Sequence, residues 1–139
     1  PSSISYTGNN RTHMIRITDP GRFELRLMDG SANPYLLQAS VLAAGLDGLK
    51  DKIDPGKPLN CNMYEDHKKY PNLPKLPDEL NQSLEKWKNN KKMNEAFGKE
   101  TINSYIKLRN SEIKEFKQKN IFDKSKAITR WEKDNTLDC

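Results

Sequence analysis

The sequence has few of the residues from which a large hydrophobic core is built. Only 34% of its 139 residues are hydrophobic, whereas ordinary soluble domains have roughly 45 to 50%, glycine included. The chain is long enough for one domain, so we predict a thin core. No apolar run approaches the roughly 20 residues of a membrane span, and no leader resembles a signal peptide. We therefore expect no membrane association and a cytoplasmic protein.

Cysteine and histidine are also scarce, with two of each. Cys61 lies in a polar segment and Cys139 is the last residue, and their spacing matches neither a metal knuckle nor a redox pair. We expect both to be reduced thiols. His13 is expected to be a packed or hydrogen-bonded residue and His67 a loop residue, so neither is a candidate catalytic base.

Arginine is rare too, yet most of it is concentrated near the start of the chain. Four of the six arginines lie within sixteen residues: Arg11, Arg16, Arg22 and Arg26. Guanidinium groups bind phosphate and carboxylate through two parallel hydrogen bonds. Because Arg16, Arg22 and Arg26 surround a single glutamate, Glu24, this face carries excess positive charge, which indicates an anion site. The alternative is an exposed face of cross-strand ion pairs.

The arginines fall on a predicted β-hairpin. Residues 12–18 and 22–28 alternate apolar and polar side chains, and Asp19-Pro20-Gly21 between them has the composition of a turn. A three-residue loop would give the cross-strand pairs Thr18–Arg22, Arg16–Glu24 and Met14–Arg26. Arg11 has the opposite parity, so we expect it at the strand entrance or beyond a bulge. Glu24 flanked by arginines also fits a phosphoryl-transfer site, where carboxylate oxygens hold Mg²⁺ or Mn²⁺.

The rest of the chain is predicted to be mainly helical, which makes the fold class α+β. Residues 1–32 supply the strands. Residues 33–54 begin with an asparagine cap and a proline and are apolar almost all round, so this helix should be buried on most sides, with its glycines allowing close backbone packing. Residues 55–77 form a long irregular loop. Residues 78–139 are expected to form thin, lysine-rich amphipathic helices at the periphery.

Several segments together resemble a known family more specifically than any spacing argument. They are Asn10-Arg11-x-x-x-Ile15-Arg16, Arg22-Phe23-Glu24-Leu25-Arg26, Asp29-Gly30-Ser31-Ala32-Asn33-Pro34-Tyr35, Ala43-Ala44-Gly45-Leu46-Asp47-Gly48 and Asn62-Met63-Tyr64. In order and spacing they resemble the C-terminal part of the catalytic domain of glutamine synthetase. The ending, from Trp131 to Cys139, is similar to that of a branch called type III glutamate–ammonia ligase.

The resemblance implies a ligase that phosphorylates the side chain of glutamate with ATP and then replaces phosphate by ammonia. It implies that Arg11 contacts the ATP phosphates and the reacting glutamate, that Arg16 binds ATP phosphate, that Glu24 ligates a divalent metal, Mg²⁺ or Mn²⁺, and that Arg26 holds the substrate glutamate. Tyr64 matches a tyrosine that some bacterial members modify by adenylylation, although it is first of all a loop tyrosine.

The family's remaining metal ligands would lie upstream of Pro1. We therefore expect a C-terminal piece that is inactive alone, whose partner is the upstream catalytic half and whose parent is a homo-oligomer. Three alternatives stay open: ligation of another amine to glutamate, a non-catalytic assembly piece, and a basic helical module that binds nucleic acid. The net charge of +5 favours the last, but the lysines are interleaved with nineteen acidic residues and no nucleic-acid motif is present, so we expect no nucleic-acid partner.

Overall fold

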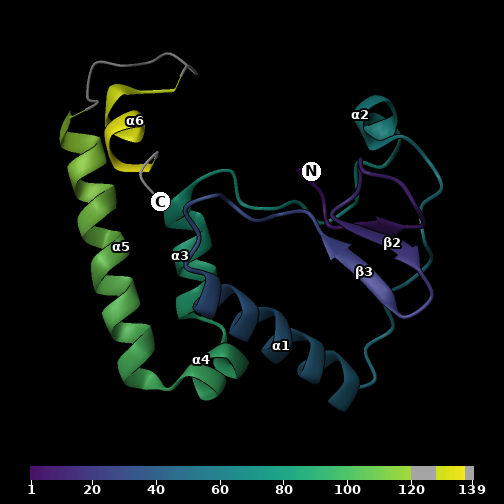
Figure 1. Ribbon diagram of the computed structural model, residues 1–139, viewed down its shortest axis with the longest axis horizontal. Coiled ribbons are helices and arrows are strands. Elements are labelled where there is room, and N and C mark those ends of the chain that lie inside the picture. The colour runs from purple at the N-terminus through teal and green to yellow at the C-terminus, as the bar shows by residue number, and fades with distance from the viewer. Residues whose placement is uncertain (120–127, 137–139) are drawn as a thin grey trace. The chain divides into compact units, whose positions relative to one another are not determined.

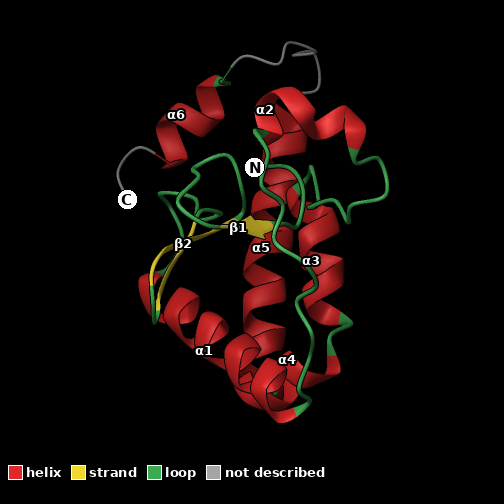
Figure 2. Ribbon diagram, turned by 90° about the vertical axis from the view of Figure 1, so that its right-hand side faces the viewer, coloured by secondary structure: helices red, strands yellow, loops and turns green. Residues whose placement is uncertain are grey.

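The computed structural model describes residues 1–119 and 128–136, and these form two compact units. The first unit contains residues 1–29 and 54–78 and includes all the strands found in the described residues (Figures 1 and 2). The second contains residues 30–53 and the chain from Glu79 onward, and it is helical. A small sheet and several helices make this an α+β protein, as the sequence predicted.

The sheet has three short strands in the order β1-β2-β3. β2 (Ile15–Asp19) and β3 (Arg22–Leu25) form the predicted antiparallel hairpin (Figure 1). β1 (Tyr6–Thr7) pairs in parallel with β2 and was not predicted. Parallel neighbours need a crossover connection and leave no turn signal between them, so a two-residue strand of this kind has little to mark it in the sequence.

The register of the hairpin is correct at its centre and wrong at its turn. Arg16 lies opposite Glu24, and the amide of Arg26 donates to the carbonyl of Met14 at 2.9 Å, which confirms two predicted pairs. The third pair is Asp19–Arg22 rather than Thr18–Arg22, because the register shifts between Ile17 and Asp19. The extra residue is a bulge, and Gly21 with φ +76° completes a tighter turn.

Residues 54–78 run back along the first strand and its approach. The amide of Ile4 donates to the carbonyl of Pro74 at 2.8 Å, and that of Leu76 to the carbonyl of Ser2 at 2.9 Å. This connection is mostly irregular, as predicted, with α2 (Met63–Asp66) and the 3-10 turn η1 (His67–Lys69) as its helical parts. It contributes Met63, whose side chain is buried. The loop therefore covers the hairpin unit and supplies part of its core.

The helix α1 (Pro34–Lys50) begins as predicted but is not buried by this chain. The side chain of Asn33 accepts hydrogen bonds from Tyr35 and Leu36. None of the helix residues is buried, and Leu42 is 64% and Leu49 77% exposed. Nor does any described atom lie within 4 Å of a Cβ built on either helix glycine. The predicted burial and close packing are thus absent from the described residues, because those residues provide too little apolar surface.

The remaining helices pack through single rows of apolar residues. They are α3 (Leu80–Lys88), α4 (Lys91–Phe97), α5 (Lys99–Lys119) and α6 (Arg130–Thr136). α3 and α5 lie side by side, with Leu84 and Ile102 buried (Figure 1). The centre of the Trp87 ring lies 5.0 Å from that of Phe97 and 5.9 Å from that of Tyr105, and both pairs of rings are tilted. These narrow contacts match the predicted thin helices. Part of the ending 131–139, residues 137–139, lies outside the described residues.

Candidate anion and metal site

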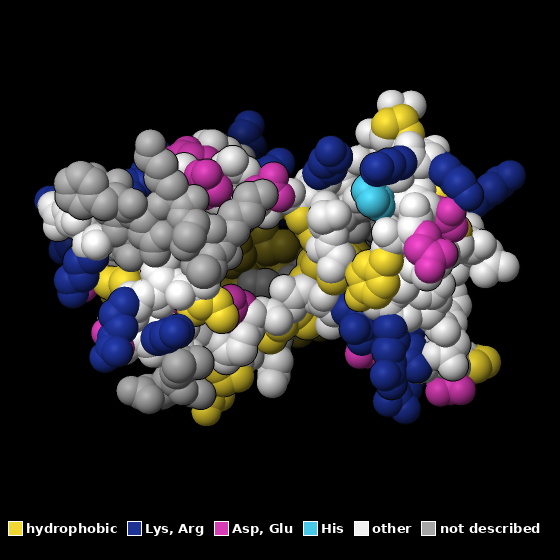
Figure 3. All heavy atoms as spheres, turned by 90° about the horizontal axis from the view of Figure 1, so that it is seen from above, with side chains coloured by type: hydrophobic (Ala, Val, Ile, Leu, Met, Phe, Trp, Pro, Cys, Tyr) yellow, Lys and Arg dark blue, Asp and Glu magenta, His cyan; other side chains and the backbone are white. Residues whose placement is uncertain are grey.

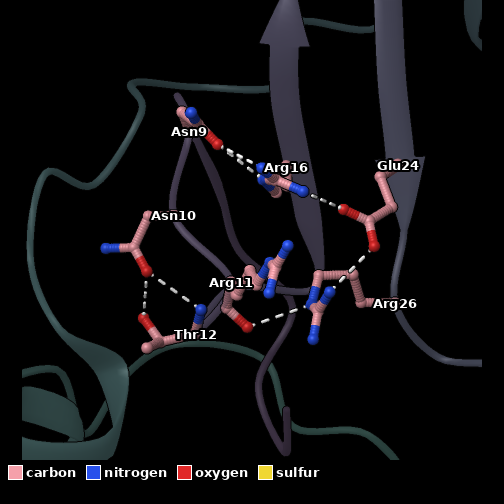
Figure 4. Close-up of polar contacts among 7 residues, drawn as sticks. All are labelled: Asn9, Asn10, Arg11, Thr12, Arg16, Glu24 and Arg26. Atoms are coloured by element: carbon pink, nitrogen blue, oxygen red, sulfur yellow. Dashed lines mark hydrogen bonds and ion pairs between the residues drawn. The ribbon is translucent and has the colours of Figure 1, made fainter.

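Two of the four clustered arginines pair with Glu24, and a third lies beside them. Arg16 and Arg26 each donate to a different oxygen of this carboxylate, at 2.7 Å to Oε2 and 2.8 Å to Oε1. Arg16 comes from β2, and Arg26 follows the end of β3, so the hairpin register sets both distances. The guanidinium of Arg11 lies beside them, between the segment carrying Asn9 and the strand carrying Glu24 (Figure 4). Two guanidinium groups thus share one carboxylate, and the third, that of Arg11, adds to the positive charge of the cluster.

Each paired arginine is also held by a second acceptor. Asn9 Oδ1 accepts from Nε of Arg16 at 2.8 Å and also from its Nη2. Nε of Arg26 donates to the main-chain carbonyl of Arg11 at 3.0 Å. The side chains of Arg16 and Arg26 are only 17% and 26% exposed. Both guanidinium planes are therefore oriented before any ligand arrives, which favours binding because less side-chain freedom remains to be lost.

The charges around Glu24 keep it ionised. The hydrogen bond from Arg16 is the main cause of a lowered pKa at this carboxyl; partial desolvation opposes it, and the charge of Arg26 adds to it. A lowered pKa in the folded state means that the pair contributes stability above the ordinary pKa of glutamate and loses it as the pH falls through the lowered value. Glu24 is therefore a carboxylate at neutral pH.

The chemistry of Glu24 fits one ligand of a divalent metal but not a whole site. Each oxygen already accepts one hydrogen bond, and a carboxylate has about four lone-pair positions, so acceptor capacity remains for a cation. Among residues 1–119 and 128–136, no three His, Cys, Asp or Glu side chains are grouped closely enough to hold a metal ion. Any such ion would need most of its ligands from elsewhere.

The other residues considered in the sequence lie outside this cluster. Arg22 is exposed beside the turn, opposite Asp19. His13 is fully buried and hydrogen-bonded through both ring nitrogens, which confirms a structural role, and His67 is exposed in η1. Tyr64 is exposed in α2. Sequence reasoning missed Asn9, although two adjacent asparagines before Arg11 are a signal for side-chain caps and clamps on neighbouring groups.

Among the residues that the structure describes, the lysine-rich surface does not form a second anion site whose side chains are oriented as those of Arg16 and Arg26 are. On the face drawn in Figure 3, Lys and Arg side chains are interleaved with Asp and Glu. Several lysines pair with carboxylates; Lys92 of α4, for example, lies 2.5 Å from Asp47 of α1 and also contacts Asp51. These pairs lower the pKa of Asp51 and raise that of Lys92. No helix in the described ranges has the length and apolar character needed to cross a bilayer.

Comparison with known proteins identifies the family. The glutamine synthetase catalytic domain matches residues 1–132. The glutamine synthetase of Rhizobium meliloti (strain 1021) is 44% identical over 138 residues, which are 99% of this chain and 30% of that protein. The glutamate–methylamine ligase of Methyloversatilis universalis is 38% identical over 119 residues, covering 84% of this chain and 26% of that protein.

A solved structure agrees with the sequence relatives. The structure described as "GmaS/ADP complex-Conformation 1" has a TM-score of 0.81 and 39% identity, covering 100% of this chain and 30% of that one. The fold is that of part of a glutamine synthetase catalytic domain. The chain belongs to the glutamine synthetase family and spans about 30% of the length of the relatives that it matches.

Proposed function

We propose that the chain is the C-terminal part of an ATP-dependent ligase that joins ammonia to the side chain of glutamate in glutamine biosynthesis. The observation that carries this proposal is the cluster of Arg11, Arg16 and Arg26 around Glu24 in a family member. The upstream catalytic half would complete the site. We further propose that the parent is a cytoplasmic homo-oligomer and that the isolated chain is inactive.

In this proposal a carboxylate oxygen of the glutamate side chain attacks the γ-phosphorus of ATP, and ADP leaves. Ammonia then attacks the resulting acyl phosphate, phosphate leaves, and the nitrogen loses a proton. Arg11 and Arg16 would neutralise phosphate oxygens, and Arg26, with Arg11, would orient the glutamate. Oriented guanidinium groups stabilise charge that develops on the transferred phosphoryl group without having to rearrange during the reaction.

Glu24 would supply one ligand to Mg²⁺ or Mn²⁺. Such an ion would supply positive charge that offsets the negative charge of the phosphate groups. Glu24 also holds Arg16 and Arg26 apart from each other at opposite carboxylate oxygens. The same side chain would therefore connect the metal to the arginines that bind substrate. The positions of Arg16, Arg26 and the metal would then all depend on Glu24 and on the strand that carries it.

A second candidate function is ligation of methylamine or another small amine to glutamate. It is favoured by the relative described as a glutamate–methylamine ligase, whose identity to this chain, 38%, is close to that of the glutamine synthetases. The two functions share the phosphoryl-transfer step and differ only in the amine. The cluster around Glu24 binds anions, so it does not distinguish between them.

The experiment is a phosphate-release assay on the purified parent protein with ATP, glutamate and Mg²⁺. Ammonium and methylamine are supplied separately, and the organic product is identified by mass. We expect release that depends on glutamate, with ammonium as the preferred amine. Preference for methylamine would support the second candidate, and no glutamate-dependent release with either amine would contradict both.

A further inference from the structure

Three neighbouring side chains connect the approach to β2 with the loop at residues 61–63. Asn10 Nδ2 donates to the carbonyl of Cys61 at 2.9 Å, and the hydroxyl of Thr12 accepts from the amide of Met63 at 3.0 Å. His13 Nε2 lies 2.9 Å from the same carbonyl of Cys61. All five residues belong to one compact unit. We call the side chains of Asn10, Thr12 and His13 with the main chain of residues 61–63 the polar clasp.

The clasp has a defined hydrogen-bonding order. A carbonyl oxygen only accepts, so His13 Nε2 carries the proton that is donated to Cys61, and Nδ1 shares a hydrogen bond with the hydroxyl of Ser5 at 3.0 Å. The hydroxyl of Thr12 donates to Asn10 Oδ1 at 2.8 Å, and the Thr12 amide donates to the same oxygen at 2.9 Å. His13 is fully buried. Each hydrogen bond of the clasp therefore restricts the orientation of the two groups that it joins.

Among residues 10–13, only Arg11 has a side chain that takes no part in the clasp. It is exposed, and it leaves the backbone on the side opposite to Asn10 and Thr12, toward the guanidinium groups of Arg16 and Arg26 (Figure 4). Its carbonyl accepts from Nε of Arg26 at 3.0 Å. The clasp thus holds the backbone from which Arg11 projects and the carbonyl that orients Arg26.

We propose that Asn10, Thr12 and His13 are positioning residues, whose clasp on residues 61–63 sets the direction of Arg11 toward the bound phosphate. This inference deepens the proposed function and rests on it only for the identity of the substrate. The geometry predicts that a change in the clasp weakens anion binding through Arg11. A purely structural role would instead lower stability and leave the binding of the folded protein unchanged.

The test uses a matched pair at Thr12 in the complete parent protein. Thr12→Val keeps the shape and loses the hydroxyl, whereas Thr12→Ser keeps the hydroxyl. The probe is inorganic pyrophosphate with Mg²⁺, measured by equilibrium calorimetry together with thermal melting. We expect Thr12→Val, which removes both hydrogen bonds of the hydroxyl, to weaken binding about tenfold, and Thr12→Ser to bind within about twofold of the wild type.

The matched control is Thr18→Val in the same hairpin. Thr18 Oγ1 is buried, and within the described residues it has no hydrogen-bond partner, so its removal should leave pyrophosphate binding unchanged. Arg11→Ala supplies the second control. If the clasp acts through Arg11, then Thr12→Val should have no further effect on binding in the Arg11→Ala background, since neighbours that act as a unit are not additive.

Equal losses from Thr12→Val with and without Arg11, or no loss in the wild-type background, would overturn the proposal. If Thr12→Val does not fold, Asn10→Ala at a half-buried position replaces it in the same cycle, with the same expected and contrary results. Pyrophosphate binding that depends on the clasp, in a parent that lacks glutamate-dependent phosphate release, would contradict the proposed function and leave the clasp supported. Glutamate-dependent phosphate release by a parent whose pyrophosphate binding does not depend on the clasp would support the proposed function and contradict the role of the clasp.

Discussion

The hairpin unit and helix α1 differ in whether their partners are present in this chain. The arginines of the hairpin find Glu24, Asn9 and a main-chain carbonyl within residues 1–29. The helix has a well-formed start and an apolar sequence, yet none of its residues is buried and Tyr35 is 82% exposed. Both are regular elements of one family domain. Within the described part of the chain, the polar groups around Glu24 are therefore paired, whereas the apolar residues of α1 are not buried.

The difference follows from the kind of interaction that each element uses. Hydrogen bonds and ion pairs are short and directional, so a hairpin and one loop suffice to make a set of them. Burial of apolar surface needs a large opposing area. Because the chain spans about 30% of the relatives that it matches, we predict that the rest of the parent covers α1.

The isolated chain should form no glutamine or N-alkyl glutamine. Glu24 can provide one metal ligand, whereas a phosphoryl-transfer site needs its ions held from several sides. The measurement is ATP- and glutamate-dependent phosphate release by the purified chain beside the parent at equal concentration. Turnover by the chain, retained after a second purification step and lost in Glu24→Gln, would mean that the hairpin unit is a complete active site.

Leu42→Ala should show whether α1, which is exposed in the isolated chain, is covered in the parent protein. In the isolated chain Leu42 is 64% exposed, so the change should alter the free energy of unfolding by no more than about 0.5 kcal/mol. In the parent it should cost roughly 2–4 kcal/mol, as for a buried leucine. The measurement is denaturant unfolding of both proteins, with the exposed Leu108→Ala of α5 as control. Equal small effects in both would mean that α1 remains uncovered.

Arg26→Lys in the parent should impair the use of glutamate more than that of ATP. Lysine keeps the charge but loses the planar fork that fits a carboxylate and the Nε that bonds the Arg11 carbonyl. We expect KM for glutamate to rise roughly 10- to 100-fold, since loss of a charge-assisted hydrogen bond costs roughly 1.5–3 kcal/mol, with KM for ATP changed much less. Equal changes in both constants would indicate that Arg26 serves the nucleotide or the fold.

The lysine-rich helices should show almost no specific anion binding. Scattered lysines contact phosphates without reading bases, and each contact releases counterions, so binding of duplex or single-stranded DNA should be weak and should disappear as salt rises. The measurement is fluorescence anisotropy with labelled DNA from low to physiological ionic strength. Submicromolar, sequence-selective binding at physiological salt would revive the nucleic-acid alternative and move the main anion surface away from the hairpin.

The features that the sequence predicted well are set by neighbouring residues, whereas most of those that it missed are contacts between residues far apart in the sequence. Alternation and the Pro-Gly turn were enough to pair Arg16 with Glu24, because register within a hairpin is set by neighbouring residues. The bulge before Asp19 was missed, since one extra residue in a strand leaves no recognisable signal in the amino-acid composition. The clasp was missed because its two sides are 51 residues apart at Thr12 and Met63. Exposure of α1 could not be seen in a sequence that is apolar all round.

Whether Glu24 links the arginines to a metal is decided by Glu24→Gln in the parent. The amide is nearly isosteric but lacks the negative oxygen that a hard divalent ion requires. Turnover is measured against Mg²⁺ concentration, together with thermal melting. We predict at least about 100-fold lower turnover, a loss on the scale of disrupted metal sites, with a raised Mg²⁺ requirement and a melting temperature close to that of the wild type. A lowered melting temperature with normal turnover and normal Mg²⁺ dependence would show that Glu24 only pairs with arginine, and would contradict the account.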